Sequence, residues 1–181
     1  MSTPMNDRRE TRLLDWKAWV KDLILSVFIA GVIIVFLYQP VRVEGTSMMP
    51  LLLDQERIFI NKFIYKFDNI HRGDIVVFWY PLDPSKSYVK RIIALPGETV
   101  KITGGRVLIN GRELREDYLR TDYRDSQSLP AVRVETDHYF VMGDHRTSSN
   151  DSRAWGTVAR SFIYGRAVLV YWPVSHFGRV Q

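Results

Sequence analysis

The sequence contains no cysteine, which excludes a disulfide framework, a thiolate metal site and a catalytic cysteine. The absence of cysteine permits an oxidising compartment but does not require one. Histidine is also scarce, and none of the four residues shows the paired spacing of metal ligands: His71, His138, His145 and His176. We therefore expect no metal site.

A strong excess of one charge is missing as well. The chain carries 25 Lys and Arg against 20 Asp and Glu, a formal net charge of +5. Five of the basic and three of the acidic residues lie in 1–21, which leaves 20 basic and 17 acidic residues for the rest. So mild and dispersed an excess is not the basic stripe of a nucleic-acid-binding protein, and no nucleic-acid partner is expected. It fits a protein near anionic lipid headgroups, and equally a solvated surface of mixed charge.

Long apolar runs are limited to one, residues 23–38, which read LILSVFIAGVIIVFLY without a charge. About 20 apolar residues typically cross a bilayer, so the run is slightly short. Trp16 and Trp19 precede it, and such aromatic residues favour the headgroup level. Lys17 and Lys21 can extend the usable length by snorkelling. The run is therefore typical of a membrane anchor.

Two other interpretations of this run are weaker. A cleaved secretory signal needs a small-x-small site after the apolar region, and residues 38–43 offer none. A buried core helix would leave the Trp and Lys flanks unexplained. We therefore predict an uncleaved anchor, with the lipid bilayer as a partner.

The anchor divides the chain into three predicted parts. The basic residues before it place the N-terminal side in the cytoplasm. We predict a cytoplasmic segment at 1–21, a single-pass anchor at 22–40 that ends at Pro40, and an extracytoplasmic domain at 41–181. The predicted location is the cell (inner or plasma) membrane.

Beyond residue 41 the pattern changes to short β runs. The predicted strands are 57–62, 74–80, 87–94, 101–103, 107–109, 132–134, 139–142 and 162–172. Gly104-Gly105 and Asn110-Gly111 indicate tight turns, whereas 113–130 and 143–155 are polar and predict loops. The pattern predicts an all-β barrel or sandwich with long connections.

A candidate nucleophile follows the apolar run, in Glu44-Gly45-Thr46-Ser47-Met48-Met49-Pro50. A serine in a turn more often bonds the backbone, and its hydroxyl is a poor nucleophile until a base takes its proton. The usual base is histidine, but no histidine here has the sequence context of a triad member, and a triad assembled in space stays open. Lysine is the known alternative if burial lowers its pKa from about 10.4.

Lys90 meets the requirement for such a base, because it lies mid-strand among apolar residues. Strand alternation puts it on one face with Tyr88 and Ile92, and puts Arg91 on the other. One of the two adjacent cations can then face the core while the other reaches solvent. Taken alone, an ordinary lysine that points outward is the simpler interpretation.

Four stretches together resemble the type I signal peptidases, the membrane-bound Ser/Lys leader peptidases. They are 44–50, the RGDIVVF of 72–78, the KRIIALPGE of 90–98, and 143–156, in that family's order after an N-terminal anchor. The resemblance implies a mainly β fold: antiparallel sheets in a partly open barrel, with a small inserted β-hairpin cap. Here the cap is expected at about 99–138 and is short. The implied activity is a serine endopeptidase that removes signal peptides from exported preproteins after Ala-x-Ala-type sites, without a cofactor.

The resemblance also implies roles for single residues. Ser47 is the nucleophile and its backbone N–H an oxyanion donor, Lys90 is the base, and Ser149 orients the lysine. Asp151 and Arg153 form a supporting ion pair. Two positions depart from the family: Gly45 replaces a Ser or Thr whose hydroxyl completes the oxyanion hole, and His145 stands where Asn is common.

An extended substrate is expected to add to a sheet edge near Ser47 and Lys90. The small side chains that such enzymes select imply shallow apolar pockets, and our candidates for their walls are Val43, Ile75, Val77, Tyr88 and Val89. The unusually apolar segment 48–53 gives a further hypothesis, in which this face dips into the outer leaflet.

Three alternatives stay open at this point. A specialised Ser/Lys maturation peptidase would differ only in pocket shape. A Ser/Lys self-cleaving repressor is disfavoured by the anchor and by the lack of a DNA-binding N-terminal domain. A catalytically inactive membrane module that binds signal sequences is disfavoured by the presence of both Ser47 and Lys90.

Overall fold

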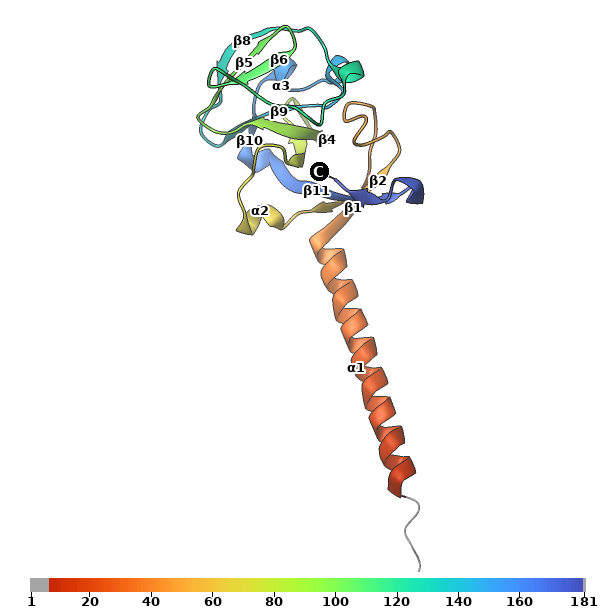
Figure 1. Cartoon of the computed structure of the whole chain (residues 1–181). Coiled ribbons are helices and arrows are strands. Elements are labelled where there is room, and N and C mark those ends of the chain that lie inside the picture. Colours follow the sequence, from red (N-terminus) through yellow and green to blue (C-terminus); the bar gives the residue numbers. More distant parts are fainter. Residues whose placement is uncertain (1–6, 181) are drawn as a thin grey trace, which may run out of the picture. The chain divides into compact units, whose positions relative to one another are not determined.

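The computed structural model describes residues 7–180, with side chains for 16–32 and 38–180. The chain divides between Tyr38 and Gln39 into two compact units. The first consists of the helix α1 (Asp7–Leu37), and the second is built of β-sheets (Figure 1). The first six residues of the predicted cytoplasmic segment lie outside the described residues.

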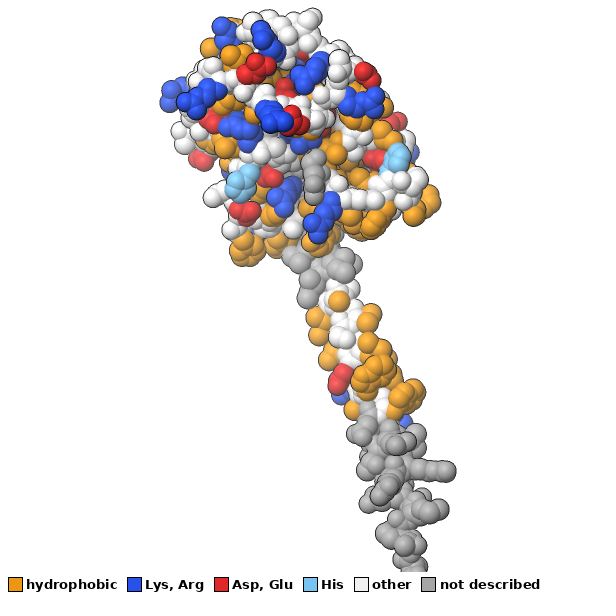
Figure 2. All heavy atoms as spheres, viewed as in Figure 1, with side chains coloured by type: hydrophobic (Ala, Val, Ile, Leu, Met, Phe, Trp, Pro, Cys, Tyr) orange, Lys and Arg blue, Asp and Glu red, His pale blue; other side chains and the backbone are white. Residues whose placement is uncertain are grey.

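Helix α1 presents apolar side chains to its surroundings over the part with described side chains (Figure 2). Ile24, Val27 and Phe28 are 63%, 64% and 67% exposed. In the described part of the chain, no helix combines the length and the hydropathy needed to cross a membrane. The predicted anchor at 22–40 therefore stays a prediction. The helix itself stops earlier than the prediction that Pro40 ends it, because α1 ends at Leu37 and Pro40 lies inside strand β1 (Tyr38–Arg42).

The main sheet has the strand order β1-β2-β11-β3-β4-β9-β10, and β12 also pairs with β11. Its further strands are β2 (Arg57–Asn61), β3 (Ile75–Tyr80), β4 (Asp83–Ala94), β9 (His138–Met142), β10 (Val158–Ala159), β11 (Ile163–Trp172) and β12 (Gly178–Arg179). A second sheet has the order β7-β6-β5-β8 and consists of β5 (Thr99–Thr103), β6 (Arg106–Ile109), β7 (Arg112–Glu113) and β8 (Leu129–Arg133). It occupies most of the range predicted for the cap.

Six short helical segments connect the strands. They are α2 (Ile64–Phe67), α3 (Ser152–Trp155) and the 3-10 turns η1 (Thr121–Tyr123), η2 (Arg146–Ser148), η3 (Arg160–Phe162) and η4 (Val174–His176). The segments η2 and α3 lie in the predicted loop 143–155, and η1 lies in the predicted loop 113–130. A single turn of helix contains too few residues to show a helical periodicity in the sequence.

The predicted mainly β fold with antiparallel sheets is confirmed, because the pairings from β2 onward are antiparallel. The main sheet is not a closed barrel, since its end strands β1 and β10 do not pair with each other in the described structure. The predicted turns are also confirmed: Gly104-Gly105 joins β5 to β6, and Asn110-Gly111 joins β6 to β7.

Strand β9 separates two apolar cores. Tyr139 and Val141 pack into the core that also holds Val76 and Phe78 of β3, whereas the alternate residues of β9 pack into the core under the second sheet. The end of β4 is buried on both faces in the same way, with Ile92 in the first core and Ile93 in the second. A strand that is close-packed on both faces is held rigidly. Lys90 lies just before this part of β4, which is buried on both faces.

A third core takes up part of the 48–53 segment, for which the hypothesis of contact with the lipid leaflet stays a prediction. Met48 is 1% exposed and Leu52 is fully buried. Both pack against Val43, Ile58 and other residues of the sheet. Met48 and Leu52 therefore belong to the protein's own core, whereas Met49, Leu51 and Leu53 stay half-buried.

Candidate active site

Ser47 begins a turn that is anchored in the fold on both sides. Gly45 before it has φ +92°, a conformation that favours glycine, and its N–H donates to Asp54 Oδ1 at 2.8 Å. Met48 after it is buried in the third core. Ser47 thereby lines a cavity of about 470 Å³.

Lys90 reaches Ser47 from strand β4, where it pairs with Val76 of β3. Its Nζ lies 2.6 Å from Ser47 Oγ, within hydrogen-bond distance, although the two residues are 43 positions apart. Lys90 is only 4% exposed. Among the residues with described side chains, Lys90 is the one side chain that hydrogen-bonds the Ser47 hydroxyl.

The surroundings of the amine favour its neutral form. Burial lowers the pKa of Lys90 to about 8; the charge of Arg153 adds to this lowering, and the charges of Asp151 and Asp144 oppose it. Nζ lies 5.4 Å from the ring centroid of Tyr88, a contact that favours the charged form and so opposes the effect of burial. An appreciable fraction of the amine is therefore neutral, and able to accept a proton, near physiological pH.

Arg91, the neighbour of Lys90, does not reach solvent, so that part of the strand prediction is wrong. Its side chain is 5% exposed and pairs with Asp144, which is 2% exposed. Nε and Nη2 donate to the two carboxylate oxygens at 2.9 and 2.7 Å. The guanidinium also lies 3.9 Å from the ring centroid of Tyr118. Burial of this ion pair is tolerated because the planar guanidinium of Arg91 presents two N–H donors that match the two oxygens of the Asp144 carboxylate.

The structure brings Asp151 and Arg153 together as an ion pair, with Arg153 Nε 2.8 Å from Asp151 Oδ1. The carboxylate also accepts the Gly143 N–H at 3.0 Å. Burial by itself raises the pKa of Asp151, but the hydrogen bond and charge of Arg153 outweigh it, so this pKa lies below its ordinary value. Arg153 holds a second carboxylate, Asp125. These contacts tie the ends of the 143–153 loop together.

Ser149 lies beside the site and makes no hydrogen bond to the amine. Its Oγ is buried and has no hydrogen-bond partner among the residues with described side chains. It is nonetheless close enough to Asp151 to help lower the pKa of that carboxyl. A Cβ on Gly143 would stand 2.3 Å from Ser149 Oγ and 2.4 Å from the Ser47 carbonyl oxygen, so only glycine fits there. The predicted bond from Ser149 to Lys90 is not formed in this structure, and its orienting role stays a prediction.

Four of the five candidate pocket residues line the cavity: Val43, Val77, Tyr88 and Val89. Ile75 does not, because its side chain packs in the third core and is 2% exposed. The cavity has further walls from Ile58 of β2 and Tyr164 of β11. Sequence reasoning missed these two because the order of the strands in the sheet brings β2 and β11 to the cavity.

His145 is a further residue at the site that sequence reasoning noted only as a departure. Its backbone N–H donates to the Ser47 carbonyl at 3.0 Å, and its Nδ1 lies 3.2 Å from the Thr46 carbonyl oxygen. His145 therefore contacts the backbone of the turn that contains Ser47.

The described residues hold no group of three His, Cys, Asp or Glu side chains that suits a metal ion.

Comparison with known proteins shows the family to which the chain belongs. Residues 16–172 match the family model described as signal peptidase, peptidase S26. The chain belongs to this family. It is 41% identical over 169 residues to a signal peptidase I of Leptolyngbya laminosa, covering 89% of this chain and 82% of that protein. It is 39% identical over 173 residues to signal peptidase I T of Bacillus subtilis strain 168, covering 90% and 89%.

A solved signal peptidase I from Enterococcus faecalis V583 is also similar, with 31% identity and a TM-score of 0.49 over 55% of this chain and 97% of that one. The family and these relatives make the protein a serine endopeptidase of the signal peptidase I kind, which acts in the removal of signal peptides.

Proposed function

We propose that this signal peptidase cleaves preproteins through a Ser47–Lys90 dyad and an acyl-enzyme. The observation that carries the proposal is the 2.6 Å approach of Lys90 Nζ to Ser47 Oγ at a buried position. A hydroxyl needs a neighbouring base to become a nucleophile, and a lysine can be that base only when burial lowers its pKa. Both conditions are supported at this pair of side chains.

The reaction follows from the pair. The neutral Lys90 amine takes the proton of Ser47 as Oγ attacks the scissile carbonyl carbon. The resulting ammonium then protonates the leaving amine, the C–N bond breaks, and an ester on Ser47 remains. Water attacks the ester while Lys90 again accepts the proton, and return of that proton to Oγ releases the new acid.

The oxyanion formed in both steps needs hydrogen-bond donors at the cavity. The Ser47 N–H is available, because it donates to no acceptor among the described residues. Gly45 supplies no hydroxyl, so the backbone amide has a larger share of the stabilisation here than in relatives with a Ser or Thr at that position.

The substrate is proposed to bind as an extended strand between two free edges. β1 is the end strand of the main sheet, and β9 pairs with β4 only from Arg91 onward. Residues 41–47 and 87–90 both line the cavity. Free backbone groups on facing segments favour β-addition of a peptide.

Selection of small side chains, as in Ala-x-Ala, is supported by the cavity walls. Val43 and Val77 are each 5% exposed and Ile58 is 1% exposed, so these walls are held in the fold. Close-packed walls do not yield to a bulky side chain without a cost in packing energy. Small substrate residues are therefore favoured.

The protein is proposed to be attached to the cell membrane through α1, with its N-terminal side in the cytoplasm. The exposed apolar side chains of α1 support an apolar environment for this helix. The basic residues at 8–21 support the orientation. The β unit would then face the exported preprotein outside.

A precursor-cleavage assay tests the function. The purified chain, Ser47→Ala and Lys90→Ala are compared on a preprotein with an Ala-x-Ala site. Cleavage by the wild type and loss of at least about 1,000-fold in both variants is expected, since each removes a group that acts as a unit with the other. Equal cleavage by all three would remove the dyad from the mechanism, and no cleavage by any would favour a module that only binds signal sequences.

A further inference from the structure

Both peptide groups that flank Ser47 are held by one residue, His145. The carbonyl of the Thr46–Ser47 peptide lies 3.2 Å from His145 Nδ1. The carbonyl of the Ser47–Met48 peptide accepts the His145 backbone N–H at 3.0 Å. The two contacts span almost 100 positions of the chain and join the nucleophile turn to the 143–153 loop.

The contact to Thr46 fixes where the imidazole carries a proton. A carbonyl oxygen only accepts hydrogen bonds, so Nδ1 has to donate. The same oxygen also accepts the Met49 N–H at 3.1 Å. With two donors on one carbonyl, both of its lone pairs are used and the Thr46–Ser47 peptide plane cannot rotate freely.

The other end of that peptide plane is the Ser47 N–H. The Thr46–Ser47 bond is trans, so the N–H points opposite to the carbonyl. The carbonyl is directed at His145 and Met49, which leaves the N–H directed away from them. This N–H donates to no acceptor among the described residues, and Ser47 lines the substrate cavity.

We propose that His145 is a positioning residue for the oxyanion. By donating from Nδ1 to the Thr46 carbonyl, it aims and polarises the Ser47 N–H, which donates a hydrogen bond to the oxyanion. A hydrogen bond accepted by an amide carbonyl makes its N–H a stronger donor, because linked hydrogen bonds polarise one another. The inference rests on the proposed function, in which Ser47 is the nucleophile.

The ring of His145 is itself held in place. It meets the ring of Tyr123 edge to face, with 4.5 Å between centroids and 84° between planes. Aromatic pairs favour this arrangement. Tyr123 comes from η1, in the segment between β7 and β8, so part of the second-sheet insertion supports the orientation of the imidazole.

The assignment explains how the site works without a hydroxyl at position 45. With Gly45 the backbone amide of Ser47 is the donor on which stabilisation of the oxyanion depends. Preorganised donors are effective because they need no reorientation as charge develops. Two hydrogen bonds to the carbonyl of the same peptide provide that preorganisation.

A matched set of variants separates the N–H of His145 from its ring. His145→Phe keeps a ring against Tyr123 but has no N–H, and His145→Asn keeps a side-chain N–H but has no ring. Tyr123→Leu removes the ring partner and leaves the histidine. For each, kcat and KM on an Ala-x-Ala peptide are measured, together with the inhibition constant of a peptide aldehyde. With the aldehyde, Ser47 Oγ bonds the carbonyl carbon, the hydroxyl proton passes to Lys90, and the carbonyl oxygen becomes the oxyanion.

For His145→Phe we expect kcat to fall about 10- to 100-fold with KM within about twofold, since one preorganised donor is impaired. The aldehyde should bind more weakly by a similar factor. His145→Asn and Tyr123→Leu should each retain kcat within about fivefold, because both keep a donor for the Thr46 carbonyl. An unchanged kcat in His145→Phe would overturn the proposal, as would an equal loss in His145→Asn, which would assign the effect to the ring and not to its N–H.

A second pair covers the case in which His145→Phe unfolds. His145→Gln and His145→Met have similar size, and only Gln can donate. A lower kcat for His145→Met than for His145→Gln supports the proposal, and equal kcat values for the two variants overturn it. Ser47→Ala in the same assay separates failure of the proposed function from failure of the His145 role. If Ser47→Ala still cleaves, the proposed function has failed. If Ser47→Ala is inactive and His145→Phe is fully active, only the role of His145 has failed.

Discussion

Burial of the Lys90 amine affects the activity and the stability of the protein in opposite directions. The pKa of about 8 makes the amine usable as a base. The same burial means that the folded state disfavours the charged form that the unfolded chain keeps up to its ordinary pKa of about 10.4. The residue that we propose as the base is therefore expected to weaken the fold at neutral pH.

The first prediction concerns the pH dependence of activity. Because the base has to be neutral, kcat/KM should rise with pH and level off above an apparent pKa of about 8, the value to which burial lowers Lys90. A pH profile on a peptide without titratable side chains measures this. A profile that is flat between pH 6 and about 9, or one that rises only above about 10, would contradict the assignment of Lys90 as the base.

The second prediction concerns Lys90→Met. The unfolded chain binds more protons than the folded one between pH 8 and about 10.5, so wild-type stability rises with pH across that window. Below it, Lys90 costs on the order of 3 kcal/mol, which Met avoids. Lys90→Met should therefore be inactive yet have a higher unfolding midpoint at pH 7, and its advantage should shrink as the pH approaches about 10. A lower midpoint of Lys90→Met at pH 7 would show that the amine stabilises the fold.

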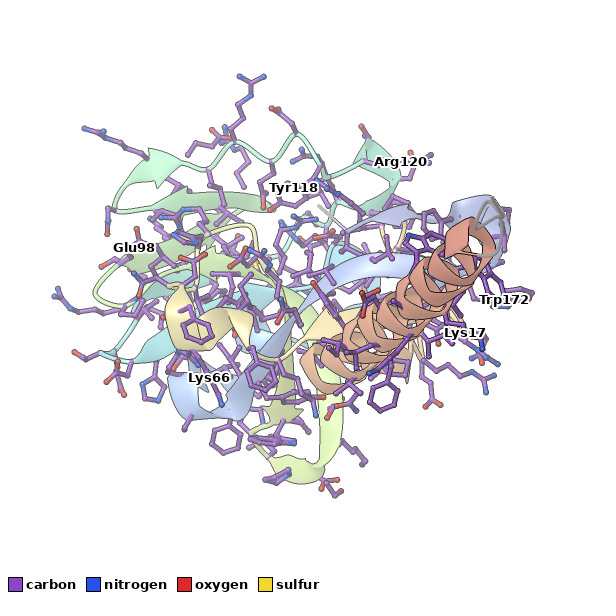
Figure 3. All side chains as sticks on the ribbon, turned by 90° about the horizontal axis from the view of Figure 1, so that it is seen from below. Lys17, Lys66, Glu98, Tyr118, Arg120 and Trp172 are labelled. Atoms are coloured by element: carbon purple, nitrogen blue, oxygen red, sulfur yellow. The ribbon has the colours of Figure 1, made fainter. Side chains whose placement is uncertain are left out.

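Among the structural elements, the segment 116–125 between β7 and β8 has more order than its polar sequence indicates. Glu116 pairs with Arg146, and Asp125 pairs with Arg153. Between them, Tyr118 covers Arg91 and Tyr123 meets His145. In Figure 3 Tyr118 lies among the side chains of the β unit, whereas Arg120 lies at the edge of the view. The segment therefore contacts both the 143–153 loop and Arg91, the neighbour of Lys90.

The third prediction tests the contribution of that segment. Glu116 and Arg146 are 3% and 2% exposed, so Glu116→Ala leaves a buried guanidinium without its carboxylate and should cost about 3–5 kcal/mol of unfolding free energy. Asp122→Asn is the matched control, because its pair with Arg120 is exposed and should change stability by less than about 1 kcal/mol. Denaturant unfolding measures both, and equal midpoints for the two variants would contradict the prediction.

At the scale of the whole molecule, the chain consists of a helix with exposed apolar side chains and a β unit with its own three cores. A compact unit with its own core can in principle fold by itself. All residues that line the cavity beside Ser47, from Val41 to Tyr164, belong to the β unit. Removal of the helix is therefore expected to separate attachment from catalysis.

The fourth prediction follows for a chain that starts at Tyr38. Its kcat/KM on a soluble Ala-x-Ala peptide should stay within about threefold of the full chain, because the cores and cavity are retained. It should no longer sediment with membrane vesicles, whereas the full chain should. Sedimentation of the truncated chain with vesicles would contradict an attachment through α1.

Much of the fold was predictable because local residues decide it. Gly104-Gly105 and Asn110-Gly111 favour tight turns whatever surrounds them, and both turns form as predicted. The apolar runs that became β3 and the end of β4 were readable as buried strands. The end of α1 was misplaced because Tyr38 and Gln39 suit either a helix or a strand, and pairing with β2 decides between them.

The sequence by itself indicated Ser47 and Lys90 as the candidate pair, because four stretches together carry the family resemblance, whereas the neighbours of each residue alone favoured a simpler interpretation. Only the tertiary structure decided that Arg91 is buried against Asp144, that Met48 packs in a core rather than facing lipid, and that His145 meets the backbone of Ser47. Each of these outcomes joins segments dozens of residues apart. Such contacts depend on which strands pair and how their side chains fill space, and no local pattern encodes that choice.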